Sequence, residues 1–410
     1  MVFEILLFVL LGIGVGIFAG LCPGMHPNTL FFIVLALSSF IPVSSYSLIA
    51  FIITVSIMDL MANYIPNIFL SVPDTDLVIN VLPGHRLVLK GKGHDALFIS
   101  LLGAYGTLVL CLILLPLLIY IIPFLHNFVY PYIHILLLVT TGWMCLVEKG
   151  IKKKMLCALM YVLSGVWGIL CLNSPAIKSQ DVLFPALIGM FGVSSLILSL
   201  KEKVKLPEQR LSKEIKIGKT WKIVSVGLIA GLLTGILPGI GQSQAAVMVS
   251  TFGRMSEKEF LGSLSGINMS NLVFSIISLY SFGKIRSGAA AAIDEISDFG
   301  FNELLFSACI MLLSSSLAVL ITWFMGKNLL KYLQKVNYTL ISKVVVVLII
   351  GMVFWFTGFI GLFILFISTC MGILPALLGI KRTSNMGFLM VSTMFYFAGL
   401  GGATSQFIIA

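Results

Sequence analysis

The sequence has little charge. Asp, Glu, Lys and Arg make up 10% of its 410 residues, while 59% of the residues are hydrophobic and the mean hydropathy is +1.09. Between Asp95 and Glu148 there is no charged side chain at all. Because about 20 apolar residues in a helix cross a bilayer core of about 30 Å, such runs predict an all-α polytopic membrane protein. No soluble domain of useful size fits between the predicted spans.

The sequence also lacks the motifs of metal sites and of intramembrane enzymes. Its seven cysteines are scattered and form no Cys-x-x-Cys pair, which argues against a zinc site or a disulfide framework. It has no His-Glu-x-x-His and no Gly-x-Gly-Asp motif, and a single intramembrane Asp is a poor catalytic set. We therefore expect no enzymatic activity, no metal and no cofactor, with Na⁺ or H⁺ bound only as a coupling ion.

A five-residue pattern occurs twice, 215 positions apart. The apolar segments on either side of each copy, residues 5–21 and 28–40 and then 223–237 and 242–253, are shorter than a span. Each copy therefore predicts a hairpin of two half-helices that meet inside the membrane, where the freed backbone groups become a working site. The alternative is a pair of proline kinks filled by neighbouring helices. The pattern is Gly12, Gly16, Gly20, Pro23 and Gly24, repeated as Gly227, Gly231, Gly235, Pro238 and Gly239.

The basic residues predict the topology. If the linker 201–222 is cytoplasmic, all of the 26 basic residues except Lys178, Lys284 and Arg286 lie on the cytoplasmic side. This arrangement places both termini outside the cell. Residues 1–200 and 223–410 then form two inverted repeats, each with one hairpin and about five spans, as in secondary transporters. The predicted full spans are residues 46–70, 97–122, 131–147, 155–172 and 182–200, and then 260–282, 304–325, 344–357, 361–379 and 386–408.

The residues around the two breaks predict an anion site. Glycines there leave backbone N–H groups open, and small polar residues begin each returning half-helix, whose positive end attracts anions. Two such ends suit a carboxylate or a phosphate, whereas simple helix capping without a ligand is the alternative. The predicted substrate-binding residues are Gly20, Pro23, Gly24, His26, Asn28 and Thr29, with Gly235, Pro238, Gly239, Gly241, Gln242, Ser243, Gln244, Asn268 and Asn271 in the second half.

Asp59 is predicted to couple transport to an ion. It is the only acidic residue between Glu4 and Asp74, and it lies inside a predicted span, with Asn63 one helical turn later. A carboxylate at membrane depth is costly and is by default a functional hypothesis, so we expect Asp59 and Asn63 to bind Na⁺ or carry a proton. The alternative is a neutral, hydrogen-bonded Asp in a packed helix interface.

These motifs together resemble a known family. The two hairpins, the loop from Val72-Pro73 through Gly84 to Ala96-Leu97, and the pair Asn268 and Asn271 are similar to the large membrane subunit of the tripartite tricarboxylate transporters, of which this chain looks like a divergent and short member. The resemblance implies an inverted-repeat permease for organic anions, driven by an ion gradient. It also implies two partners, an extracytoplasmic binding protein and a small membrane subunit.

The sequence therefore predicts a secondary transporter that moves an organic anion, in the first place a carboxylate, across the cell membrane by alternating access with H⁺ or Na⁺ coupling. The alternative is a translocase for a polyprenyl phosphate or another lipid-linked anion, for which Lys284 and Arg286 lie suitably beside the second hairpin. Membrane lipids and a second copy of the chain are further expected partners. Nucleic acid is not expected, because the basic residues lie in short loops between spans.

Overall fold

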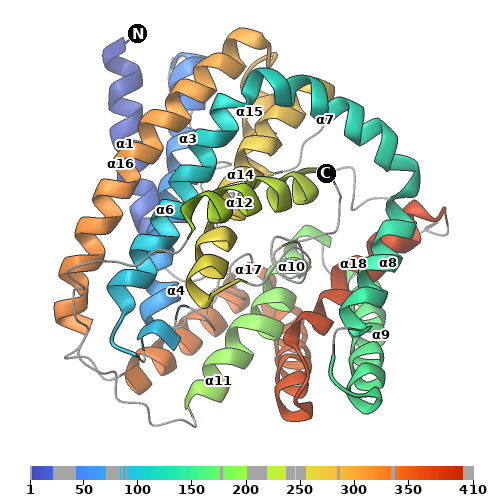
Figure 1. The fold of residues 1–410 in the computed structure, drawn as a ribbon. Coiled ribbons are helices and arrows are strands. Elements are labelled where there is room, and N and C mark those ends of the chain that lie inside the picture. The colour runs from blue at the N-terminus through green and yellow to red at the C-terminus, as the bar shows by residue number, and fades with distance from the viewer. Residues whose placement is uncertain are drawn as a thin grey trace.

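The described part of the chain is helical. The computed structural model describes residues 2–21, 43–70, 84, 86–88, 90–146, 148–175, 179–200, 219–236, 245, 255–283, 287–333 and 338–399 (Figure 1). These residues contain no strand, and nine of their helical segments are long and apolar enough to cross a bilayer. The chain is thus an all-α polytopic membrane protein, as predicted. The nine segments are Val2–Leu21, Ser45–Phe69, Gly93–Ile113, Leu115–Leu146, Ile151–Leu172, Asp181–Leu198, Glu257–Phe282, Phe301–Asn328 and Val346–Leu378.

Each half of the sequence begins with a glycine-rich helix that is followed by a long buried one. The first half contains α1 (Val2–Leu21), α3 (Ser45–Ala62), α4 (Tyr64–Leu70), α6 (Gly93–Ile113), α7 (Leu115–Val129), α8 (Ile133–Leu146), α9 (Ile151–Leu172), α10 (Ser179–Leu187), the π-helix η2 (Ile188–Val193) and α11 (Ser194–Leu200). The second half contains α12 (Thr220–Ile236), α14 (Glu257–Phe282), α15 (Gly288–Ile296), α16 (Phe301–Leu333), α17 (Tyr338–Leu378), the short η3 (Arg382–Met386) and α18 (Gly387–Phe397).

Local sequence signals account for the ends of the inner helices. Ser44 caps α3 by accepting a hydrogen bond from the backbone N–H of Ser47. Ser256 and Glu259 form a reciprocal capping box at the start of α14. Gly283 ends α14 with a φ of 60°, a left-handed conformation in which a side chain is disfavoured.

Three predicted segments, 5–21, 97–122 and 386–408, differ from the observed helices. The predicted half-helix 5–21 is observed as α1 (Val2–Leu21), whose 20 residues can cross the bilayer by length and composition, so the prediction that this segment is shorter than a span is wrong. Glu4 lies in the first turn of α1, and its carboxylate accepts a hydrogen bond from the N–H of Ser44. The predicted span 97–122 ends instead at Ile113, because Leu114 leaves the helix and Pro116 starts a new one.

The new helix, α7, runs across the top of the molecule from the α6 side towards α8 and α9 (Figure 1). In the second half, Gly358 (φ 63°, ψ −155°) divides α17 into two helices, which correspond to the predicted spans 344–357 and 361–379. The predicted span 386–408 is observed as η3 and α18 as far as Phe397. Residues 400–410 lie outside the described part of the chain.

The helices enclose two main cores. Side chains of α1, α3, α4, α6, α7, α14, α15 and α16 form the first core, and those of α8, α9, α10, η2, α17 and α18 form most of the second. The helix α14 contributes to both, with Met269 in the first core and Ile267 in the second. The spans built on α3 and α14 are each 89% buried without any lipid around them, so they are the innermost helices of the fold.

Candidate functional site

The glycine stripe of α1 brings this helix into close contact with α3. A Cβ atom on Gly12 would lie 2.9 Å from the Cβ of Thr54, and one on Gly16 would lie 2.6 Å from the Cβ of Met58. At Gly20, a Cβ would lie 2.6 Å from the carbonyl oxygen of Asp59. Real Cβ atoms do not approach other atoms this closely, so the stripe is required for packing. It places the end of α1, where the first break begins, directly against Asp59.

The glycine stripe of α12 packs on α14 in the same register. A Cβ on Gly227 would lie 3.1 Å from the Cα of Gly266, and one on Gly231 would lie 2.8 Å from the Cβ of Ser270. A Cβ on Gly235 would lie 2.8 Å from the Cβ of Phe274. Phe274 follows Asp59 by 215 positions, which is also the spacing between Gly235 and Gly20. The repeat thus extends to the contacts, and Phe274 replaces the carboxylate in the second copy.

The helices that carry the two stripes run in opposite directions. At the contacts of α1 with α3 and of α3 with α16, residue numbers increase in the same direction, so these three helices are parallel. The helices α6, α12 and α14 are parallel to one another for the same reason. Where α6 contacts α16, residue numbers increase in opposite directions, so the first group of helices is antiparallel to the second. The contacting pairs are Gly12 with Thr54, Gly20 with Asn63, Tyr46 with Glu303, Thr54 with Ser314, Ile99 with Gly262, Thr107 with Gly266, Gly227 with Gly266, Gly235 with Phe274, Leu97 with Gly326, and Tyr105 with Ser316.

The two halves also exchange helices. The helix α6 of the first half packs on α12 and α14, and the helix α16 of the second half packs on α3. The closest approach is at Gly103, where an added Cβ would overlap the backbone of Gly262. Each inner helix is therefore held between the stripe helix of its own half and one helix of the other half. This exchange fixes the positions of α3 and α14 relative to each other.

Ser44, the N-cap residue of α3, lies beside the start of α1, whereas Leu21 is the last residue of α1. The N–H of Ser44 donates a 3.0 Å hydrogen bond to Oε1 of Glu4 in the first turn of α1. The helix ends at Leu21, about 25 Å away at 1.5 Å per residue. The same holds in the second half, where the N–H of Lys219 donates to Glu259 at the start of α14. Residues 22–42, 237–244 and 246–254 lie outside the described part of the chain, so the two returning segments stay predictions.

Asp59 and Asn63 lie beside Gly20 near the end of α1, and Asn271 contacts Thr234 near the end of α12. Asp59 is 7% exposed, and its carbonyl oxygen accepts a 2.9 Å hydrogen bond from the N–H of Asn63. In the second half, Oγ1 of Thr234 donates a 3.3 Å hydrogen bond to Oδ1 of Asn271. Sequence analysis did not identify Thr234 as part of the site, although it directly precedes Gly235 of the repeated pattern.

Asn268 is the most unusual side chain in this region. It is 1% exposed, and neither its Oδ1 nor its Nδ2 has a hydrogen-bond partner among the residues that the structure describes. An unsatisfied amide costs free energy when it is buried, so a position of this kind calls for a ligand or water. Asn67, at the same spacing from Asn63 as Asn63 from Asp59, has the same property. Sequence analysis did not place Asn67 in the site.

Most of the predicted site residues lie outside the part of the chain that the structure describes. Gly20, Gly235, Asn268, Asn271, Asp59 and Asn63 fall within the described part of the chain. The others lie outside it, so their roles stay predictions. These are Pro23, Gly24, His26, Asn28, Thr29, Pro238, Gly239, Gly241, Gln242, Ser243 and Gln244.

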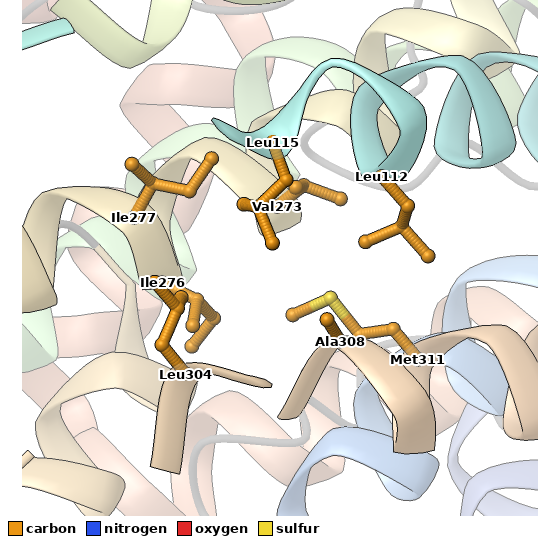
Figure 2. A pocket seen from close by; sticks show the side chains of 8 residues that line it. All are labelled: Leu112, Leu115, Val273, Ile276, Ile277, Leu304, Ala308 and Met311. Carbon is orange, nitrogen blue, oxygen red and sulfur yellow. The ribbon is translucent and has the colours of Figure 1, made fainter. Parts of the chain in front are cut away.

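The cavity between α6, α7, α14 and α16 is not a substrate site. Figure 2 shows its lining, in which all eight side chains are apolar, including Leu112, Val273 and Met311. Its volume of about 10 Å³ is at the lower limit of what a single water molecule needs. An organic anion neither fits there nor finds a polar group, so this cavity is a packing gap between helices.

Sequence analysis did not foresee a cluster of ion pairs at the start of α6, α12 and α14. Lys258 Nζ lies 3.0 Å from Oδ2 of Asp95, whose side chain is 3% exposed. This pair joins the two halves, because Asp95 starts α6 and Lys258 starts α14. Glu257 forms ion pairs with Arg86 at 3.5 Å and with Lys90 at 3.0 Å. Glu259 forms one with Lys222 at 4.0 Å.

Comparisons with known proteins agree with this architecture. The model of the tripartite tricarboxylate transporter TctA family matches residues 6–387. An uncharacterized protein of Methanocaldococcus jannaschii is 30% identical over 407 residues, which cover 96% of this chain and 98% of that protein. No solved structure matches the chain.

The family is one of membrane transporters, consistent with the expectation that the chain is not an enzyme, and the match gives no support to the lipid-linked anion translocase. The family match covers the first break, both stripe helices, both inner helices and the exchanged helices α6 and α16. This multi-pass membrane protein therefore belongs to the tripartite tricarboxylate transporter TctA family.

Proposed function

We propose that the chain is a permease that moves an organic anion, in the first place a carboxylate, by alternating access with H⁺ or Na⁺ coupling. The observation that carries this proposal is the matched packing of α1 on α3 and of α12 on α14, in one register and in opposite directions. Secondary transporters use such oppositely directed broken helices to build one site near the bilayer midplane. Membership of a transporter family supports the same reading.

We propose further that residues 1–200 and 223–410 are inverted repeats joined by the cytoplasmic linker 201–222, with both termini outside. The antiparallel relation of α1 and α12 and the reciprocal exchange of α6 and α16 support this arrangement. In this arrangement, the two stripe helices enter the membrane from opposite surfaces. Movement of one core against the other then exposes the shared site to each side in turn.

The proposed binding site is formed by the two returning segments, each of which begins where a stripe helix ends. The backbone N–H groups and small polar side chains of the two returning segments bind the substrate carboxylate, as positive helix ends do. Thr234 and Asn271 border the second break, and Asn268 supplies an amide without a protein partner in the described structure. Asp59 and Asn63 border the first break and hold the coupling ion. The coupling carboxylate is in the first half, because its counterpart is Phe274.

The family name also suggests partners for this chain. A tripartite transporter has two further components, which we propose are a small membrane subunit and an extracytoplasmic binding protein. The proposed substrate class is a carboxylate and is not restricted to the tricarboxylate of the family name. The first break carries His26 at the position where the second carries Gly241, so the two returning segments would contact the substrate differently. A second copy of this chain is a further proposed partner.

The test is a thermal-shift measurement on the purified chain with a panel of dicarboxylates and tricarboxylates, followed by uptake into proteoliposomes under a Na⁺ or a pH gradient. A ligand at 100 times its Kd stabilises the folded state by about 2.7 kcal/mol, a readily measured shift in Tm. We expect at least one carboxylate to shift the Tm and to accumulate only with a gradient. Stabilisation by none of them, or by polyprenyl phosphate alone, would contradict the proposal.

The same measurement with Asn268→Ala separates a ligand contact from ordinary packing. Removing an unpartnered buried amide raises the stability of the free protein by about 1–3 kcal/mol, and it abolishes the shift caused by substrate. Ser265→Ala is the matched control one turn earlier in the same helix, because the hydroxyl of buried Ser265 donates to the carbonyl oxygen of Leu261, and this variant should keep the shift caused by substrate. A substrate shift that survives in Asn268→Ala would remove this residue from the site.

A further inference from the structure

Six basic residues lie in or beside the connection from α8 to α9 and the connection from α17 to α18. Oε1 of Glu148 accepts a 2.9 Å hydrogen bond from the N–H of Lys381, which ties the two loops together. Nζ of Lys153 lies 3.6 Å from the position of a Cβ on Gly379. We name the six residues the basic cluster. They are Lys149, Lys152, Lys153, Lys154, Lys381 and Arg382.

The lysines of the basic cluster have no carboxylate partner within the described residues. None of the five forms a salt bridge there, although four of the five are well exposed. Glu148 is 8% exposed, and its carboxylate is engaged by the backbone of the neighbouring loop. The charges at the start of α6, α12 and α14 are arranged differently, since there Arg86, Lys90, Lys222 and Lys258 each contact a carboxylate.

Several features make the basic cluster unfavourable without an anion. Four of its lysines adjoin the first turn of α9, where the helix dipole is already positive. Burial lowers the pKa of Arg382, because its guanidinium is partly desolvated. A phosphate group would offset the repulsion between the lysines and the positive end of α9.

Apolar side chains surround the basic cluster on the membrane side. Leu146 at the end of α8 is 62% exposed, Met155 in α9 is 67% exposed, and Leu377 in α17 is 69% exposed. A free phosphate gains nothing from these side chains, whereas the acyl chains of a phospholipid cover them. The combination of a phosphate-seeking cluster and an adjoining apolar surface therefore favours a lipid over a soluble anion.

We propose that the basic cluster is a binding site for the headgroup of an anionic phospholipid, which bridges the α8–α9 and α17–α18 connections. The lysines and Arg382 bind the headgroup phosphate, and the acyl chains lie against α8, α9 and α17. The site is separate from the proposed transport site at the ends of α1 and α12. It stands on its own observations, whichever substrate the protein carries.

Native mass spectrometry of the full chain tests this proposal, with phosphatidylglycerol as the anionic lipid and phosphatidylcholine as the neutral one. Each Lys or Arg near an anionic surface contributes about 1 kcal/mol, so Lys152→Gln with Lys153→Gln should weaken phosphatidylglycerol binding by about 30-fold. Lys327→Gln with Lys343→Gln removes the same charge from two exposed lysines elsewhere, and it should change binding less than about twofold. Lys152→Arg with Lys153→Arg should keep the affinity.

Three results would overturn the proposal. Equal losses in the two glutamine variants would show that only net charge matters, and no loss in the first variant would show that the basic cluster does not bind lipid. Displacement of phosphatidylglycerol by millimolar glycerol 1-phosphate would show that the basic cluster binds phosphate alone and that the apolar surface is not used. Unchanged Tm values of the variants check that all of them fold.

Discussion

Asp59→Asn is expected to reduce ion-driven accumulation of substrate at least 100-fold while the protein still folds and binds substrate. Asp59 is buried in α3, and its backbone touches Gly20 at the end of the first stripe helix. An amide has nearly the same shape as a carboxylate, but it neither carries a proton nor balances a sodium charge. The change therefore removes coupling and leaves packing nearly intact. Uptake into proteoliposomes with and without the gradient measures it.

Ser56→Ala is the matched control for Asp59→Asn. Ser56 lies one turn before Asp59 in the same buried helix, and its hydroxyl donates only to the carbonyl oxygen of Ile52. We expect this variant to accumulate substrate as the unmodified protein does. If Asp59→Asn also kept its dependence on Na⁺ or on pH, Asp59 would be a packing residue and the coupling group would lie elsewhere.

Gly16→Leu is expected to abolish transport and to destabilise the protein by about 3 kcal/mol or more. A Cβ on Gly16 would lie 2.6 Å from the Cβ of Met58 and 2.9 Å from the carbonyl oxygen of Val55, and the rest of the leucine would need still more room. The helix α1 must then move away from α3. That movement takes the end of α1 away from Asp59 and opens the first break.

Gly14→Leu is the control on the same helix. A Cβ on Gly14 would meet nothing within 4 Å, and the residue faces outwards, where lipid accepts a leucine side chain. Transport and Tm should remain close to those of the unmodified protein. Unfolding curves in detergent and uptake assays compare the two variants, and similar losses in both would mean that the stripe is not specific for the α1–α3 contact.

The repeated glycine pattern marked the first helix of each half, but not the helix that packs against it. The structure packs the glycine faces of both copies against the next long helix of the same half. The charge-free runs predicted the spans, because composition alone decides whether a helix is stable in lipid. Ser256 and Glu259 marked the start of α14 as a capping box, although sequence analysis did not use this signal.

Other features depend on contacts that sequence patterns do not encode. The end of α6 at Leu114 was missed because the apolar run continues through Pro116 without a polar residue to mark a turn. The exchange of α6 and α16 between the halves joins residues such as Gly103 and Gly262, which lie far apart in the chain. The pairing of Lys258 with Asp95 was missed for the same reason, since both residues look like ordinary loop charges.

Site-directed labelling of the two stripe helices tests the central claim most directly. In a cysteine-free variant, a single cysteine is placed at Val2, where α1 starts, or at Lys219, just before α12. Intact cells are then treated with a maleimide that does not cross membranes. We predict that Val2→Cys reacts in intact cells and that Lys219→Cys reacts only after the membrane is opened. Reaction of both cysteines from the same side would contradict the opposed insertion of the two breaks.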